Sequence, residues 1–454
     1  MVVTRFAQTV PHPRDFVYKW HSRPGAVRRL TPPFLAEVLG EPDGGLSPGA
    51  QSHFQIRGLP PPTNRWTTEY AEIVPGSQFT ERLVRGPVSK WTHVQHFEEH
   101  SNCTRVLSEL DFRFMRDYPF AARRRIQDSI SRMVYYRHEQ LLSELEFASS
   151  HDGPPLRIAV SGSSGIIGRE LVALLRTLGH DVVPIIRTDI PLDDGVAINT
   201  ESGWVDEEAL SRVDAVVHLA AEPVGKRFTP EHKRRIAESR VSMTSDLAAA
   251  AARSARVRTF VSASAIGYYG AAPSGEVTEE SPQGADFLAR VCAAWEESAD
   301  PARDAGLRVV NLRTGPVLTP DGDFLRPMLR SFRAGNRGSP AGGAAWHSWI
   351  SIDDVVGLYA HAVLDARMSG AVNAVAPQPT TWSEMARELA RQLSRPELVP
   401  MPRPAAAAWF GREGSRLYVH ASQRASAEKA AAAGYEFRHP ALSGALRHVL
   451  GQTI

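Results

Sequence analysis

The sequence predicts an α/β fold in which a doubly wound parallel sheet with a small C-terminal substrate region follows an α+β domain. Three observations support this prediction. The 454 residues exceed what one typical core accommodates. In the first third of the chain, strand-like runs are separated by turn formers. From residue 156 onward, apolar strand-like runs alternate with helical patterns, which is typical of a parallel sheet.

The composition limits the class of protein. An apolar fraction of 43% and a charged fraction of 22% are those of a soluble globular chain, and the net charge of +2 is too balanced for a nucleic-acid-binding protein. The two cysteines lie far apart in sequence, so we expect neither a disulfide framework nor a metal site. The sequence contains no signal peptide and no apolar run of membrane-spanning length. We therefore expect a cytoplasmic protein, and the oligomeric state stays open.

We expect four segments along the chain. Residues 1–148 form the first domain, and the polar, proline-containing residues 149–155 form a linker. Residues 156–400 form the second domain, and residues 401–454 form a C-terminal extension.

The first domain reads as a strand, a short helix, several further strands and a long helix. The short helix covers residues 13–20, and the long amphipathic helix covers residues 126–147. The predicted strands are 4–10, 50–57, 65–74, 77–84, 89–98 and 102–114.

This order of elements resembles the helix-grip fold of the START/polyketide-cyclase (SRPBCC) superfamily. Residues 86–93 with Phe97 and Glu98 are similar to segments of that superfamily. The resemblance implies an apolar cavity between the sheet and the long helix, and hence an apolar small-molecule ligand. A filled core that serves as a docking or structural module is the alternative.

The second domain begins with a strand, a glycine-rich turn and a helix. The apolar residues 156–160 lead into Gly162, Gly165 and Gly168, and a helical pattern follows. Backbone N–H groups at a helix start point outward, and glycines allow the backbone to approach a pyrophosphate. The turn therefore predicts a Rossmann-type dinucleotide site, with an ordinary tight turn as the alternative.

The second strand of this domain ends at Arg187. Dinucleotide-binding enzymes that prefer NAD usually carry Asp or Glu near this point, whereas an arginine pairs with the 2′-phosphate of NADP. Arg187 therefore favours NADP. Its alternative role is that of a surface arginine.

Further strands at 214–223, 257–263 and 307–312 alternate with helices at 229–252 and 286–299. Together with the glycine turn, several motifs resemble the atypical extended short-chain dehydrogenase/reductases known as epimerase family proteins, which are NAD-dependent epimerase/dehydratase-like. The motifs are residues 161–168, 218–223, 238–240, 264–270, 312–318, 349–354 and 373–377. The resemblance implies cofactor contacts at Gly162, Ser163, Gly165, Ile166, Ile167, Gly168, Arg187, Leu219, Ala220, Arg240 and Arg313.

The chain lacks part of the catalytic set that short-chain dehydrogenases usually carry. Ser264 matches the usual serine, but Leu288 and Cys292 stand where Tyr-x-x-x-Lys is expected. That tyrosine normally exchanges a proton, with its pKa lowered by the lysine. Tyr268 and Tyr269 follow Ser264 closely and are the candidate phenols, with packing beside the nicotinamide as their alternative role.

The predicted function is that of an NADP-dependent oxidoreductase or epimerase acting on an unknown small molecule. Hydride would move between the nicotinamide and a carbon held near Ser264. The missing tyrosine and lysine keep a second hypothesis open, an NADP-sensing or scaffold protein without hydride transfer. A lipid-binding module with a vestigial dinucleotide domain is a third hypothesis.

Overall fold

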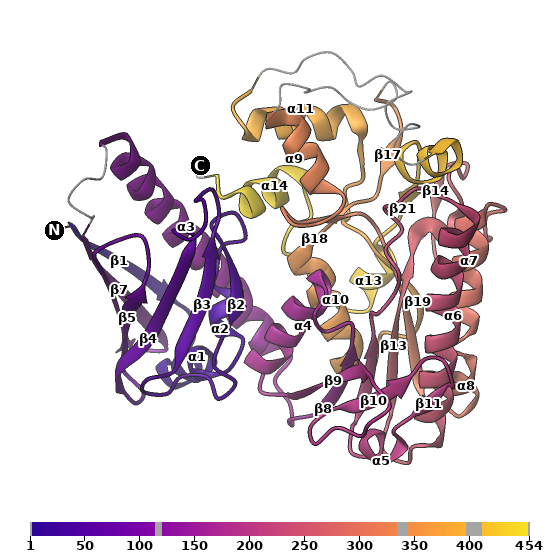
Figure 1. The fold of residues 1–454 in the computed structure, drawn as a ribbon, viewed down its shortest axis with the longest axis horizontal. Helices are drawn as coiled ribbons and strands as arrows, with labels where there is room; N and C mark the ends of the chain where they lie inside the picture. Colours follow the sequence, from indigo (N-terminus) through magenta and orange to yellow (C-terminus); the bar gives the residue numbers. More distant parts are fainter. Residues whose placement is uncertain (1, 114–119, 334–342, 396–410, 453–454) are drawn as a thin grey trace. The chain divides into compact units, whose positions relative to one another are not determined.

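The computed structural model describes residues 2–113, 120–333, 343–395 and 411–452 (Figure 1). The chain divides into two compact units. The first contains the residues up to Gly153 with Ala173–Gly179 and the residues from His448 onward, and the second contains Pro154–Val172 and His180–Arg447. The division after Gly153 falls within the linker expected from the sequence. The expected boundary between residues 400 and 401 lies outside the described residues.

The N-terminal unit contains a seven-stranded sheet in the order β1-β7-β6-β5-β4-β3-β2, and every neighbouring pair is antiparallel. Its strands are β1 (Val2–Val10), β2 (Ala36–Gly40), β3 (Gln51–Ile56), β4 (Arg65–Val74), β5 (Gln78–Arg85), β6 (Lys90–His100) and β7 (Cys103–Arg113). The helices are α1 (Arg14–Ser22), α2 (Ala26–Arg29) and α3 (Phe120–Ser150). The elements expected from the sequence are present in their expected order, and β2 is an additional edge strand.

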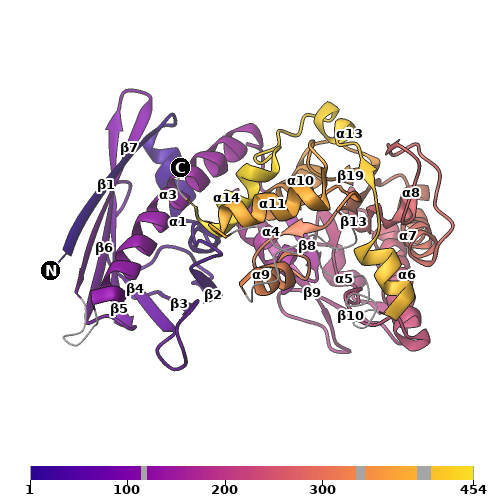
Figure 2. The same ribbon diagram turned by 90° about the horizontal axis from the view of Figure 1, so that it is seen from above.

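One face of this sheet carries the core of the unit. Along β6, His93, Gln95 and Phe97 are buried, whereas the residues between them are half-buried, as the alternation of a strand requires. Phe97 packs with Trp20 of α1 and Leu145 of α3 in one cluster. The long helix α3 therefore covers the buried face of the sheet (Figure 2).

The second unit contains an eight-stranded sheet in the order β11-β10-β9-β8-β12-β13-β15-β19. All neighbours are parallel except β10 and β11. The strands are β8 (Arg157–Ser161), β9 (Asp181–Arg187), β10 (Val196–Asn199), β11 (Trp204–Val205), β12 (Ala215–His218), β13 (Thr259–Ala265), β15 (Arg308–Thr314) and β19 (Gly370–Ala374). The chain leaves β8 toward β9 and later returns to β12 on the other side, so the strand order reverses between β8 and β12.

Helices cover both faces of this sheet, which confirms the predicted α/β class. The helices α6 (Pro230–Arg253), α7 (Phe287–Glu297) and α8 (Asp300–Asp304) lie on one face, and α4 (Ile166–Thr177) and α10 (Ile352–Leu364) lie on the other (Figures 1 and 2). The shorter elements are α5 (Glu207–Leu210), η1 (Ile266–Tyr269), β14 (Glu276–Val277), β16 (Val317–Leu318), α9 (Leu325–Arg333), β17 (Trp346–His347), β18 (Ile350–Ser351), β20 (Thr380–Thr381), α11 (Trp382–Gln392), η2 (Ser415–Val419), β21 (Arg424–Ala425), α13 (Glu428–Ala432) and α14 (Leu442–Leu450).

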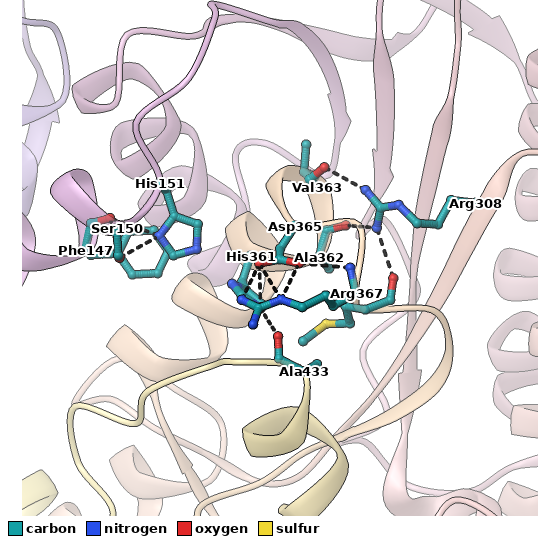
Figure 3. A network of polar contacts seen from close by, with 11 residues as sticks. Phe147, Ser150, His151, Arg308, His361, Ala362, Val363, Asp365, Arg367 and Ala433 are labelled. Carbon is teal, nitrogen blue, oxygen red and sulfur yellow. Dashed lines mark hydrogen bonds and ion pairs between the residues drawn. The ribbon is translucent and has the colours of Figure 1, made fainter.

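The segment that follows α11 packs onto α10. His361 of α10 contacts the carbonyl oxygen of Ala433 at 3.0 Å, and Asp365 at the end of α10 pairs with Arg367 (Figure 3). The hydroxyl of Tyr435 donates to Asp354 Oδ1 at 3.2 Å. Residues well beyond 411 therefore belong to the same core as the parallel sheet.

Within the ranges that the structure describes, no helix is both long and apolar enough to cross a bilayer.

Candidate cofactor and substrate site

The glycine turn after β8 leaves no room for side chains. Gly162 has a φ of +67°, a conformation that L side chains rarely adopt, and a Cβ there would lie 2.9 Å from the amide nitrogen of Ala220. A Cβ on Gly168 would lie 2.1 Å from the carbonyl oxygen of Gly162. The amide of Gly165 donates to the carbonyl oxygen of Gly162 at 2.9 Å, and α4 begins one residue later. The exposed backbone N–H groups at the start of α4 suit a pyrophosphate.

The end of β8 is joined to the end of β12 by Ser161. Its Oγ accepts hydrogen bonds from the amides of Leu219 and Ala220 at 3.1 and 3.3 Å. Since Oγ accepts both amides, its own proton is directed at His218 Nδ1, 2.6 Å away. Burial lowers the pKa of His218 to about 4, so this histidine is neutral near pH 7. The predicted cofactor contacts Leu219 and Ala220 thus lie beside the glycine turn.

Other predicted cofactor residues lie around the same turn. Ser163, Ile166 and Ile167 are half-buried, and the two isoleucines line a cavity of about 370 Å³. Arg187 is exposed at the end of β9, and its guanidinium has no hydrogen-bond or ion-pair partner among the described residues. Arg187 is therefore free to pair with a ligand.

The 370 Å³ cavity begins at the glycine turn. It continues between the ends of the strands on one side and the C-terminal segment on the other. Leu288 and Cys292, the residues at the positions of the usual tyrosine and lysine, both line it. Burial raises the pKa of the Cys292 thiol to about 12, so this thiol is not a base near neutral pH. The other apolar lining residues include Ile166, Val224, Ile236, Ile266, Val291, Trp295, Phe324, Trp346 and Leu417.

Arg240 of α6 also lines the cavity. Its guanidinium donates to the carbonyl oxygens of Glu222 and Ile236, both at 3.0 Å, and lies over the ring of Trp295 at 4.8 Å from the centroid. Arg240 is only 8% exposed. Two of its donor contacts therefore serve the protein itself, and its remaining N–H groups are available to a ligand.

The predicted catalytic residues come together in a buried polar network. Ser264, Arg313 and Asn373 occupy neighbouring register positions of β13, β15 and β19. Ser264 Oγ donates to Glu296 Oε1 at 2.6 Å, and Arg313 binds both oxygens of Glu296 at 2.8 and 2.9 Å. Glu296 on α7 thus joins the serine to the arginine.

The two tyrosines complete this network. The Tyr269 hydroxyl accepts from Arg313 at 3.0 Å and donates to Asn373 Oδ1 at 2.7 Å. Tyr268 lies flat against Arg313, whose guanidinium carbon is 3.5 Å from the ring centroid. Burial raises the pKa of Tyr269 to about 12, although Arg313 acts in the opposite direction. Arg313 is bonded to these protein groups, and its role at the cofactor remains a prediction, as do Ser264, Tyr268 and Tyr269 as catalytic residues.

His347 is one of the polar groups of the cavity that sequence reasoning missed. His347 of β17 is 5% exposed and lines the cavity, and its Nε2 has no hydrogen-bond partner among the described residues. Burial lowers the pKa of His347 to about 3, so the ring is neutral near pH 7. Its ring packs against Trp382 at a centroid distance of 4.1 Å. A single histidine in an irregular stretch gives no pattern from which such a role could be predicted.

The C-terminal segment forms part of the cavity wall. Leu417, Ala421 and Gln423 line the cavity. Gln423 Nε2 donates to the carbonyl oxygens of Ile266 and Gly270 at 2.9 and 2.6 Å. This amide therefore fixes the loop that follows β13.

A glycine turn without room for a Cβ, set at the reversal of strand order and opening into a cavity, defines a dinucleotide-binding α/β protein. Comparison with known sequences identifies the family to which the chain belongs. A sequence model of the NAD dependent epimerase/dehydratase family matches residues 158–374, and a domain of unknown function, DUF1731, matches residues 401–449. The chain belongs to this epimerase family, which confirms the predicted family and makes it an NAD(P)-binding protein.

Three relatives illustrate the extent of the similarity. An epimerase family protein of Mycobacterium bovis, Mb2239, is 37% identical over 293 residues, which cover 64% of this chain and 96% of that protein. The crystal structure of a nucleoside-diphosphate sugar epimerase from Corynebacterium glutamicum is 32% identical with a TM-score of 0.81, over 99% of this chain and 90% of that one. The human epimerase family protein SDR39U1, crystallised with NADPH, is 28% identical with a TM-score of 0.59, over 66% of this chain and 100% of that one.

Proposed function

We propose that this protein is an NADP-dependent oxidoreductase that transfers hydride to or from an apolar carbonyl or alcohol compound. The observation that carries the proposal is the cavity that begins at Ile166 and Ile167 of the glycine turn and continues along apolar side chains. NADPH bound at the turn would supply the hydride. The residues of the chain position the cofactor, exclude water and hold the substrate oxygen.

Arg187 supports NADP rather than NAD. It is an exposed guanidinium at the end of the second strand, where a 2′-phosphate would lie, and no described residue is its hydrogen-bond or ion-pair partner. The similar human protein was crystallised with NADPH. Replacing Arg187 by Asp should weaken NADPH binding by about tenfold or more and leave NADH binding unchanged or stronger, because a charge-assisted contact is lost. Arg395→Asp, a charge change at another exposed arginine, is the matched control.

The cavity favours an apolar substrate over a nucleoside diphosphate sugar. Among the described lining residues, Arg240 is the one side chain with a full positive charge, and it already donates to two carbonyl oxygens. Asp286 and Asp323 line the same cavity. A diphosphate would therefore lack the cluster of cations that such an anion requires.

His347 is the candidate contact for the substrate oxygen. Its neutral ring lines the cavity, its buried Nε2 has no hydrogen-bond partner among the described residues, and packing against Trp382 holds the ring in place. Because the pKa of Tyr269 is raised and Ser264 is bonded to Glu296, neither hydroxyl is prepared to act as a base near pH 7.

The same observations favour a second candidate function, in which NADP binding switches or stabilises the protein without hydride transfer. Leu288 and Cys292 cannot perform the proton exchange of the usual tyrosine and lysine. A titration of NADPH fluorescence, followed by a panel of aldehydes, ketones and quinones, separates the two functions. Oxidation of NADPH by an apolar carbonyl compound supports the enzyme, whereas binding without oxidation supports the sensor.

Gly168→Ala tests the cofactor site itself. The new Cβ would approach the carbonyl oxygen of Gly162 to 2.1 Å, so the turn must distort and NADPH binding should be lost. Gly153→Ala is the control, because nothing lies within 4 Å of its Cβ position. If Gly168→Ala folds and binds NADPH as the original protein does, the proposed site is wrong.

We also propose that the N-terminal unit is a ligand-binding domain of the helix-grip type. Its antiparallel sheet and the long helix α3 surround a cavity of about 430 Å³. This volume lies in the usual range for small-molecule sites. The domain would hold or deliver an apolar substrate. If the cavity takes up no apolar probe, the role as a filled structural module is favoured.

A further inference from the structure

The cavity of the N-terminal unit is apolar over most of its wall and has a few charged residues in its lining. Its lining comes from α2, the strands of the sheet and α3. The aromatic lining residues are Phe54, Trp66, Tyr70, Phe79, Trp91 and Phe112. The charged lining residues are Arg57, which donates to the carbonyl oxygen of Pro33 at 2.7 Å, Glu81 of β5 and Arg137 of α3. A charged group in such a wall needs a partner, because burial of an unpaired charge is costly.

The guanidinium of Arg137 has no such partner in the part of the chain that the structure describes. Among the described residues it makes neither a hydrogen bond nor an ion pair. Another buried arginine of the same unit shows the usual arrangement, since Arg29 binds Glu144 Oε1 through Nε at 3.0 Å and through a terminal nitrogen at 2.6 Å. Arg137 therefore presents donors to the cavity that none of the described residues satisfies.

The nearby carboxylate of Glu81 contacts a histidine and not Arg137. The carboxylate of Glu81 is 3.0 Å from His93 Nδ1 and forms no ion pair with Arg137. Because a carboxylate is an acceptor, the ring of His93 donates this hydrogen bond. Glu81 thus lies in the wall as a second, opposite charge beside Arg137.

The net charge of this part of the wall is close to zero. Burial lowers the pKa of His21 to about 3 and lowers the pKa of His93 below its ordinary value, so both rings are neutral near pH 7. Arg137 contributes one positive and Glu81 one negative charge. An anionic ligand bound to Arg137 would bring a second negative charge close to Glu81, whereas an uncharged ligand would not.

A water molecule can accept hydrogen bonds from only some of the N–H donors of Arg137. A small space of about 30 Å³ is also lined by Arg137 and by Gln95, whose Oε1 is buried without a partner. Such a space has room for a single water, and a guanidinium has five N–H donors. Donors remain for a ligand in the larger cavity.

We propose that this cavity binds an uncharged, largely aromatic molecule whose carbonyl or phenolic oxygen accepts hydrogen bonds from Arg137. The inference rests on the proposed ligand-binding role of the unit and names the chemical class of its ligand. The aromatic wall packs against the apolar body of the ligand. Arg137 fixes its oxygen, and a ligand hydroxyl, where present, can donate to Glu81.

Three fluorescent probes test the proposal on the full-length protein saturated with NADPH. Prodan is an uncharged naphthyl ketone, N-phenylnaphthylamine lacks the carbonyl, and anilinonaphthalene sulfonate adds an anion to the latter skeleton. We expect prodan to bind at one site per chain. Arg137→Met should weaken prodan binding about tenfold, because a hydrogen bond to a charged donor is lost, and should leave N-phenylnaphthylamine binding unchanged. Arg137→Lys should retain part of the affinity for prodan.

Two controls localise the effect. Arg105→Met removes an exposed arginine of β7 in the same unit and should change no affinity. Ala36→Phe places a ring in the cavity and should weaken both uncharged probes, whereas Leu288→Trp, which fills the other cavity, should weaken neither. Thermal melting followed by circular dichroism verifies that each variant is folded.

Each outcome has a definite meaning. If both uncharged probes bind, respond to Ala36→Phe and ignore Arg137→Met, the cavity is a ligand site but the role of Arg137 is refuted. If the sulfonate binds most tightly and depends on Arg137, the ligand class is anionic and the proposal is wrong. If no probe binds, the ligand-binding role of the unit fails together with this inference.

Discussion

Replacement of Glu296 by Gln should destabilise the second unit strongly. The carboxylate is the counter-charge of Arg313, and the exposed fractions of the two side chains are 12% and 4%. Removing one partner of a buried ion pair costs about 3–5 kcal/mol, since the remaining charge stays buried. Arg313 keeps its hydrogen bonds to Tyr269 and to the carbonyl oxygen of Glu279, so we expect the lower end of this range.

The assay is thermal unfolding followed by circular dichroism. A loss of about 3 kcal/mol corresponds to a decrease in Tm of roughly 6–12 °C. Glu207→Gln is the matched control, because Glu207 and its partner Arg253 have side chains that are 52% and 58% exposed. Exposed pairs contribute little to stability, so the control should unfold as the original protein does.

A double variant separates the ion pair from its surroundings. Glu296→Leu combined with Arg313→Met removes both charges and should be more stable than Glu296→Gln, because apolar replacements leave no buried charge unpaired. The reasoning is refuted if Glu296→Gln melts within 2 °C of the control, or if the double variant is the least stable of the set.

Three further predictions concern the same unit. His218→Gln should reduce the loss of stability on acidification. The pKa of His218 is about 4 in the folded state and 6.5 in the unfolded state, so its contribution to stability is complete above pH 6.5 and declines by up to about 3 kcal/mol as the pH falls toward 4. If the free energy of unfolding falls by the same amount between pH 7 and pH 4.5 in the variant and in the original protein, the prediction is wrong. Gly357→Ala places a Cβ 2.3 Å from the hydroxyl of Tyr435 and should lower stability by about 1–3 kcal/mol in urea unfolding, whereas Gly444→Ala, with open space around its Cβ, should not. His347→Phe should lower carbonyl turnover at least tenfold without changing the Kd of NADPH, because the ring packing is kept and Nε2 is lost; equal turnover would exclude the histidine from substrate contact.

Local patterns predicted most of the fold. The strands around Phe79 and Phe97 follow the alternation of buried and exposed residues, and the glycine turn was recognisable because sterics permit few residues there. The strand β2 (Ala36–Gly40) was missed, since it is short, lies at the sheet edge and follows two prolines. Edge strands pair on one side only, so their sequence pattern is weak.

The candidate site was less predictable because its contacts are long-range. Ser264 was identified by position, but its acceptor Glu296 lies 32 residues away, and Asn373 lies 104 residues from Tyr269. The register of β13, β15 and β19 brings these groups together, and no local pattern encodes that register. The sequence therefore predicts Arg313 at the cofactor without showing that its donors bond to Glu296 and Tyr269.

The amide of Gln423, which holds the loop after β13 by two carbonyl oxygens, has a consequence for how the second unit evolves. The epimerase sequence model ends at residue 374, yet the cavity is closed by residues from the DUF1731 region. A chain cut between these two regions would lose one side of the cavity wall. The carbonyl oxygens of Ile266 and Gly270 would then lose the hydrogen bonds from Gln423. Substitutions in the C-terminal segment can thus change the wall of the cavity while the glycine turn stays unaltered.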